Sequence, residues 1–153
     1  MQPPLQDGSM SWHVYTEIWL SGWSGTKFHD LIEAEMPSGL ANRINISGPE
    51  VKISALRVQP ISLIFHELVG NSVIHGALRA LNGSIRIKWI IDTKNAIEIE
   101  WREMIEDEAP ESDPDKLGIG LQLVTSLVEQ LGGRTWTSRT PEGFNRFFEL
   151  AIE

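Results

Sequence analysis

Three polar residues, Glu67, Asn71 and His75, follow one another at i, i+4 and i+8 near the middle of the chain. In a helix this spacing turns each residue only about 40° from the previous one, so the three form a polar stripe. A carboxylate one turn before a carboxamide supplies oxygen ligands of the kind that Mg²⁺ prefers. The spacing alone fits the solvated edge of an amphipathic helix equally well, so further motifs must decide between the two interpretations.

The stripe lies on a predicted helix that covers a hydrophobic core. Apolar residues recur at helical spacing and predict one buried face: Ile61, Ile64, Phe65, Leu68, Val69 and Val73. Pro60 fits the first turn of this helix, where its missing N–H is not needed. Gly76 follows the stripe, and we expect it to permit a left-handed turn at the end of the helix.

Two further motifs follow in sequence. Trp101-Arg102-Glu103 ends an alternating strand, and Leu117-Gly118-Ile119-Gly120-Leu121 opens a second helical pattern. Glycines at the start of a helix let backbone N–H groups approach an anion, which the helix dipole also favours. A carboxylate such as that of Glu103 is a strong hydrogen-bond acceptor. A plain turn explains an isolated Gly-x-Gly, so the order of the three motifs carries more weight than any one of them.

Together the motifs resemble the ATP-binding catalytic domain of sensor histidine kinases, within the superfamily of gyrase-, Hsp90- and MutL-like ATPases. The chain is most similar to the subgroup named for its His-Trp-Glu signature, which corresponds here to His66-Glu67-Leu68 and Trp101-x-Glu103. The resemblance runs from about Trp19 to Ile152 and keeps order and spacing throughout.

This resemblance implies ATP and Mg²⁺ as ligands. It makes Asn71 a metal ligand, and Glu67 a water-mediated metal contact or a catalytic base. His66 is a second candidate catalytic residue, with a hydrogen-bonded structural histidine as the alternative. The resemblance assigns Glu103 to the adenine amino group. The rest of the predicted nucleotide site consists of His75, Gly76, Gly118, Ile119, Gly120 and Leu121.

The composition fits one domain. A chain of 153 residues with 41% hydrophobic residues can bury one sizeable core. There is no Cys, which excludes a disulfide framework, a thiol nucleophile and a Cys-ligated zinc site. No apolar run approaches the roughly 20 residues that a membrane span requires. The start lacks the features of a signal peptide, so we expect a cytoplasmic location in a bacterium.

The net charge of −8 is concentrated between residues 100 and 115, which contain eight acids and one base. We expect most of this segment to be a loop that faces a bound triphosphate, with a repulsion that salt and Mg²⁺ partly offset. The rest of the chain has no basic stripe and no aromatic platform, which argues against nucleic acid as a partner.

The remaining pattern predicts an α+β fold. We expect a two-layer α/β sandwich in which helices cover one face of a mixed, mostly antiparallel sheet, the Bergerat-type ATP-binding fold that the resemblance implies. Residues 1–18 are expected to be a disordered or tag-like start with the remnant of a preceding helix, and residues 19–153 the catalytic domain. The predicted elements are a helix over 25–35 capped by Ser24, strands over 43–47 and 51–53, a hairpin over 85–102, a helix over 118–130 stopped by Gly132-Gly133, and strands over 134–138 and 144–152.

Departures from the resembled family leave alternatives open. The two glycines and the proline that usually follow Glu103 are replaced by Met104-Ile105-Glu106, and Ile74 replaces a base. None of the four histidines lies in a phosphoacceptor motif. The expected partner is therefore the separate dimerisation and phosphoacceptor segment of a histidine kinase, with a response regulator as an indirect partner. The alternatives are an adaptor of the same fold that does not bind ATP, and an anti-sigma-factor-like serine kinase.

Overall fold

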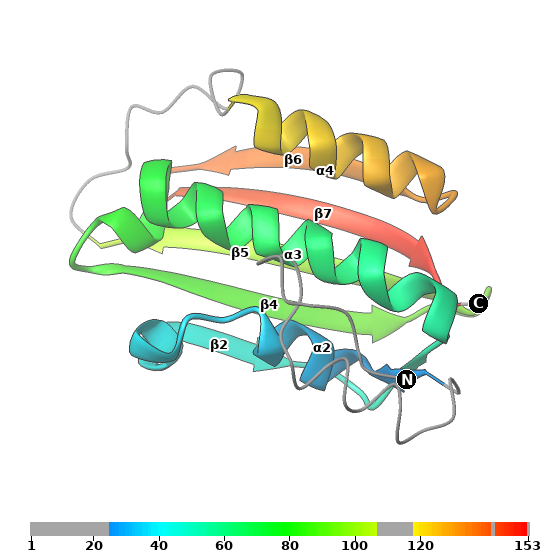
Figure 1. The fold of residues 1–153 in the computed structure, drawn as a ribbon. Helices are drawn as coiled ribbons and strands as arrows, with labels where there is room; N and C mark the ends of the chain where they lie inside the picture. Colours follow the sequence, from blue (N-terminus) through cyan, green and yellow to red (C-terminus); the bar gives the residue numbers. More distant parts are fainter. Residues whose placement is uncertain (1–24, 107–117, 142, 153) are drawn as a thin grey trace, which may run out of the picture.

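The computed structural model describes residues 25–106, 118–141 and 143–152. They form two layers, a sheet and a set of helices that covers one of its faces (Figure 1). The helices are α2 (Phe28–Ala34), α3 (Ala55–His75) and α4 (Gly118–Gln130), and 3₁₀ segments lie at η1 (Ser38–Arg43) and η2 (Ala77–Arg79). The predicted two-layer α/β sandwich is confirmed. No helix within the described residues is both long enough and apolar enough to span a membrane.

The main sheet of the described part has five strands in the order β2-β4-β5-β7-β6. The strands are β2 (Ile44–Ser47), β4 (Gly83–Ile91), β5 (Ala96–Ile105), β6 (Arg134–Thr140) and β7 (Gly143–Ala151). β2 pairs with β4 in parallel, whereas the other neighbouring strands are antiparallel. The sheet is therefore mixed and mostly antiparallel, as predicted.

The hairpin of β4 and β5 forms the centre of the sheet. Every second side chain on the two strands is buried under the helices: Ile85, Ile87, Trp89, Ile97, Ile99 and Trp101. The turn closes because the Asp92 carboxylate accepts hydrogen bonds from the backbone N–H groups of Lys94 and Ala96, at 2.8 and 2.9 Å. Ile91, the last residue of β4, is 42% exposed, although the alternation along the strand predicts a buried side chain.

Helix α3 lies between α2 and α4 and supplies much of the core (Figure 1). The predicted apolar face is buried except for Val73, which is 40% exposed near the end of the helix. Each fully buried aliphatic or aromatic side chain contributes about 1.5–3 kcal/mol. Pro60 lies in the second turn of α3, not in the first as predicted, because the helix already begins at Ala55.

The strand expected over 51–53 forms at Lys52 and Ile53, but it does not return along β2. Lys52 and Ile53 form β3 (Lys52–Ile53), which pairs with β1 (Thr26–Lys27) in a separate two-stranded sheet. The Trp89 side chain explains the change of direction, since its indole N–H donates a 2.8 Å hydrogen bond to the Pro49 carbonyl. A side chain at Gly48 would collide with the same indole ring. The chain therefore leaves β2 across Trp89 and does not fold back onto β2.

The sequence predicts the bounds of α4 correctly but not the start of α2. Helix α2 begins at Phe28 and not near Gly25 as predicted, because residues 26–27 are taken up by β1; Ser24, the expected cap, lies outside the described residues. Helix α4 spans the predicted residues and ends as expected. Gly132 has a positive φ of 73°, and the Gly133 N–H donates a 2.9 Å hydrogen bond to the Val128 carbonyl.

Candidate functional site

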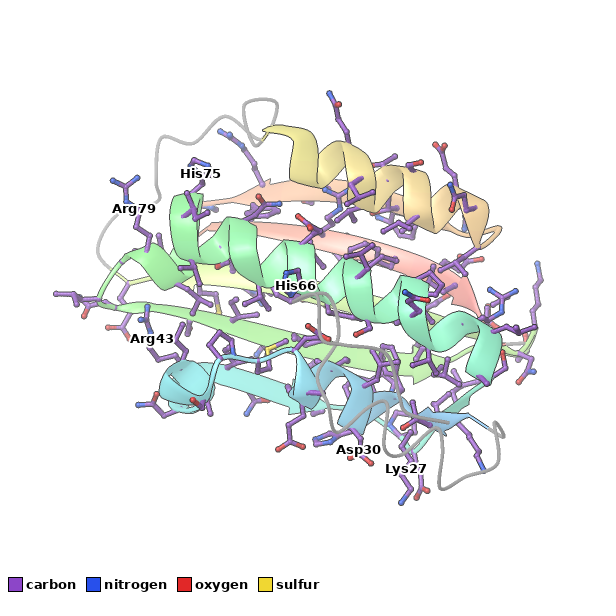
Figure 2. The ribbon with its side chains drawn as sticks, in the orientation of Figure 1. Lys27, Asp30, Arg43, His66, His75 and Arg79 are labelled. Atoms are coloured by element: carbon purple, nitrogen blue, oxygen red, sulfur yellow. The ribbon has the colours of Figure 1, made fainter. Side chains whose placement is uncertain are left out.

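The motif-bearing elements meet at one end of the molecule. The C-terminal end of α3, the last residues of β5 and the first turn of α4 all lie there (Figure 1). Figure 2 shows His75 at this end of α3, with Arg79 of η2 beyond it. Since the sheet fixes β5 and the core fixes α3, the candidate site is built on rigid elements.

Glu103 is buried at the centre of this end, with only 5% of its surface exposed. Its Oε1 atom accepts hydrogen bonds from the Ser72 hydroxyl at 2.5 Å and from the Ala77 backbone N–H at 3.0 Å. Its Oε2 atom accepts one from the Trp101 indole N–H at 3.1 Å. Three donors from α3, the following turn and β5 therefore hold one carboxylate in a fixed orientation.

Burial raises the pKa of the Glu103 carboxyl, because removal from water disfavours the charged form. The hydrogen bonds from Ser72, Ala77 and Trp101 act in the opposite direction, since all three donors stabilise the carboxylate. Desolvation is the largest of these effects. A carboxylate held in this way is a strong acceptor for a further donor from a ligand.

Gly76 is needed for a different reason from the one the sequence predicted. Its φ of −117° and ψ of −152° are extended and not left-handed, so the predicted left-handed turn is wrong. A Cβ atom at this position would collide with Glu103 Oε1. Glycine therefore lets the chain after α3 pass directly over the carboxylate, which brings the Ala77 N–H within hydrogen-bonding distance.

Asn71 and Glu67 lie on α3 at the predicted i, i+4 spacing, and both are half-buried. The Asn71 Nδ2 atom is buried and has no hydrogen-bond partner among the described residues. An unpaired buried amide costs about 1–3 kcal/mol, so a partner from a ligand or water would relieve that cost. His75, the last residue of α3, is exposed.

His66 lies apart from the other candidate residues. Its Nδ1 atom is 3.3 Å from Oε2 of Glu35, a side chain that is only 5% exposed and that follows α2. The Ser62 hydroxyl donates a 2.6 Å hydrogen bond to Glu35 Oε1. Five positions separate His66 from Asn71, which turns them about 140° apart around α3. Figure 2 shows His66 midway along the helix, away from its end at His75. The structure therefore gives His66 a hydrogen-bonded contact between α2 and α3.

The segment Gly118, Ile119, Gly120 and Leu121 forms the start of α4, as the sequence predicted. Its helical backbone places the first N–H groups of α4 at the end of the molecule where α3 and β5 end (Figure 1). Such groups have no partner within their own helix and are available to an anion. The acidic segment before α4 lies largely outside the described residues, which resume at Gly118.

The contacts that hold Glu103 and His66 in place were not predicted from the sequence. Ser72 follows Asn71 directly, and its side chain is fully buried, yet its contact with Glu103 spans 31 residues of sequence. Trp101 is fully buried in the core, and its indole N–H also donates a hydrogen bond to Glu103. The i, i+2 spacing places Trp101 and Glu103 on the same face of a strand, and this is the sequence signal from which their contact could have been predicted.

The chain has relatives among named histidine kinases. No model of a protein family matches it. It is 32% identical over 132 residues to a blue-light-activated histidine kinase of Rhizobium johnstonii, a match that covers 85% of this chain and 38% of that protein. A protein of the same name from Brucella ovis is 33% identical over 113 residues, covering 71% of this chain and 23% of the relative. The chain thus spans well under half of the length of these curated relatives.

Solved structures share the fold at lower sequence identity. The histidine kinase domain of a blue-light activated histidine kinase from Erythrobacter litoralis superposes with a TM-score of 0.70 at 16% identity, over 91% of this chain and 70% of that one. The histidine kinase domain of the E. coli osmosensor EnvZ gives a TM-score of 0.57 at 17% identity, over 86% and 89% of the two chains. The sequence relatives, the signature residues and the shared fold agree, and the chain belongs to the histidine kinase catalytic-domain family of the His-Trp-Glu subgroup.

Proposed function

We propose that this chain binds ATP together with Mg²⁺ and transfers the γ-phosphoryl group to a histidine on a separate dimerisation segment of a histidine kinase. The activities named for the relatives, which are longer proteins, support the reaction class. A response regulator would then receive the phosphoryl group from that histidine. In this proposal the chain supplies the nucleotide site and the partner supplies the acceptor.

The observation that carries the proposal is the buried and unpartnered Nδ2 atom of Asn71, considered among the described residues. This amide lies on the side of α3 nearest Glu67 and one residue before Ser72, which contacts Glu103. A ligand with acceptor oxygens, such as a phosphate and its bound waters, would satisfy Nδ2 while the amide oxygen remains available to a metal ion.

These residues fit a Mg²⁺-bound nucleotide. The Asn71 amide oxygen would hold the metal without adding a negative charge beside the phosphates, and Glu67 would hold a metal-bound water. Bound Mg²⁺ would neutralise charge on the phosphate oxygens. The backbone N–H groups at Gly118 and Gly120 would contact phosphate oxygens at the start of α4. Glu103 would accept a hydrogen bond from the adenine amino group.

In this proposal the two candidate catalytic residues have different roles. Glu67 is half-buried one turn before Asn71, where a base acting on the attacking group would be needed. His66 keeps a structural role in this proposal, because its imidazole already contacts Glu35 on the α2 side of α3. Transfer then depends mainly on the positioning of the nucleotide and of the partner's histidine.

An adaptor without nucleotide binding is the second candidate, and the end of β5 favours it. Met104 and Ile105, which replace the usual glycines, continue β5 and pair with Ser84 and Gly83 of β4. The strand therefore continues, paired with β4, where the resembled kinases usually have two glycines and a proline. An adaptor of this fold would bind its kinase or regulator partner whether or not ATP is present.

Isothermal titration calorimetry with ATP, in the presence and absence of Mg²⁺, separates the two candidates. We expect binding that requires Mg²⁺ and is weakened by Asn71→Ala without loss of the folded state. Asn45→Ala, at an exposed position on β2, is the matched control and should bind as the wild type does. If the wild-type chain binds no nucleotide with Mg²⁺, the kinase proposal fails and the adaptor remains.

A further inference from the structure

Trp101 has a second role besides filling the core. Its ring packs against Phe65 of α3 with a centroid distance of 6.2 Å, and the side chain is fully buried. Its indole N–H points along the strand to Glu103 Oε2 at 3.1 Å. Because the ring packs between the sheet and α3, the indole N–H can point in one direction only. The direction of the donor in turn restricts the rotation of the carboxylate.

The Glu103 carboxylate has a lone-pair position that no donor among the described residues fills. Two carboxylate oxygens offer about four lone-pair positions. Ser72 and the Ala77 N–H occupy both positions at Oε1, and Trp101 occupies one at Oε2. The remaining position is therefore at Oε2. Without the Ser72 and Trp101 donors, the side chain could rotate and present either oxygen, or a protonated hydroxyl, to a ligand.

We propose that Trp101 and Ser72 are specificity-determining positioning residues, which hold the Glu103 carboxylate so that one acceptor position at Oε2 selects an adenine base. The inference rests on the proposed function and goes beyond it, since neither residue need touch the nucleotide. An adenine presents an amino donor at its C6 position, and a guanine presents a carbonyl acceptor there. A carboxylate held in a fixed orientation attracts the first and repels the second.

The chain offers a matched control for this idea. Trp89 is a second buried tryptophan of the same sheet, and its indole N–H donates a 2.8 Å hydrogen bond to the Pro49 carbonyl. Trp101→Phe and Trp89→Phe therefore remove the same chemical group from the same kind of environment. Only Trp101→Phe removes a donor from Glu103. Ser72→Ala removes a second donor from the same carboxylate with a smaller change in volume.

The test measures the affinities of wild type and the three variants for Mg²⁺-ADP and Mg²⁺-GDP by calorimetry. We expect wild type to prefer ADP, and Trp101→Phe and Ser72→Ala each to reduce that preference by roughly tenfold, chiefly through weaker ADP binding. Trp89→Phe should keep the wild-type ratio of affinities. A purely structural role for Trp101 would weaken both nucleotides together and leave the ratio unchanged.

A second measurement uses the wild-type chain, so it tests the inference even where a variant does not fold. In the ¹H–¹⁵N spectrum of the wild-type chain, the Trp101 indole resonance should shift when ADP is added, more than when GDP is added, whereas the Trp89 resonance should stay in place. Nucleotide binding with an unchanged ADP-to-GDP ratio in the folded Trp101→Phe and Ser72→Ala variants overturns this inference alone. Absence of any nucleotide binding by wild type overturns the proposed function and this inference with it.

Discussion

Arg146 of β7 donates a 3.0 Å hydrogen bond to the Thr125 hydroxyl of α4, and this contact joins the sheet to the helix that begins at Gly118. Its Nε atom donates another, at 3.1 Å, to the Thr135 hydroxyl of β6. The side chain is buried, and no carboxylate pairs with it in the part of the chain that the structure describes. Burial therefore lowers the pKa of this guanidinium, because the neutral hydroxyl groups that accept its hydrogen bonds do not offset the loss of water.

We expect Thr125→Val to lower the free energy of unfolding by about 1–3 kcal/mol, because it leaves a buried charged donor without its acceptor while keeping the shape of the side chain. Urea unfolding followed by circular dichroism measures the change. Thr137→Val is the control, since Thr137 is exposed on β6 beside Arg146 and should change stability by no more than about 0.5 kcal/mol. Equal effects of the two substitutions would show that the Arg146 contact contributes nothing.

Glu103 should give the fold a pH dependence of its own. Burial raises its folded-state pKa above the ordinary value of 4.5, so the folded chain holds this proton more tightly than the unfolded chain. Stability then falls as pH rises from about 4.5 through the raised pKa, because the unfolded chain has already lost the proton in that window. Glu103→Gln removes the titrating group and should remove this slope.

The measurement is the free energy of unfolding of wild type and Glu103→Gln over a series of pH values from about 4 to 8. The difference between the two isolates Glu103, because the other titrating groups are common to both proteins. The two curves should diverge above about pH 4.5, with wild type losing stability relative to the variant. Parallel curves over the whole range would contradict the raised pKa.

Much of the fold could be predicted because its signals are local. The alternation along β4 and β5 identifies the hairpin, and the apolar spacing along α3 and α4 identifies both helices. The pairing of β3 could not be predicted in this way. Its two residues, Lys52 and Ile53, follow a Gly-Pro turn that also suits a hairpin, and the Trp89 indole that redirects the chain lies 40 residues from Pro49 in sequence.

The candidate site, like the fold, could be predicted from the sequence only in part. Resemblance to a family made Asn71, Glu103 and the start of α4 candidates, because motifs are contiguous in sequence. The contacts that support them are not contiguous. Ser72 meets Glu103 across 31 positions, and His66 meets Glu35 across 31 positions in the other direction. Gly76 shows the limit most clearly, since the space that it leaves for Oε1 of Glu103 appears only in three dimensions.

Ser62 should stabilise the contact between α2 and α3. It is fully buried, and its hydroxyl donates a 2.6 Å hydrogen bond to the nearly buried carboxylate of Glu35. We expect Ser62→Ala to lower the free energy of unfolding by about 1–3 kcal/mol, because a buried carboxylate oxygen loses a donor. Ser126→Ala, the same substitution at an exposed position of α4, is the control and should change it by about 0.5 kcal/mol or less. Urea unfolding measures both variants, and a difference between them too small to measure would mean that water replaces the lost donor.

The isolated chain should not phosphorylate itself, even where it binds ATP. Of its four histidines, His29 lies 3.5–3.6 Å from the carboxylates of Asp30 and Glu33, and His66 contacts Glu35. His75 ends the helix that carries Asn71, where attack on a phosphate held by that helix is geometrically unfavourable. His13 lies outside the described residues and has no neighbours of a phosphoacceptor motif.

Transfer should therefore appear only when a dimerisation segment with its acceptor histidine is added in trans. Incubation with γ-labelled ATP and Mg²⁺, followed by acid treatment, measures this directly, because phosphohistidine is labile in acid. We expect acid-labile label on the added segment and none on this chain, since in-line transfer needs an acceptor placed opposite the leaving group. Acid-labile label on this chain alone that disappears in His13→Ala would instead make His13 the acceptor.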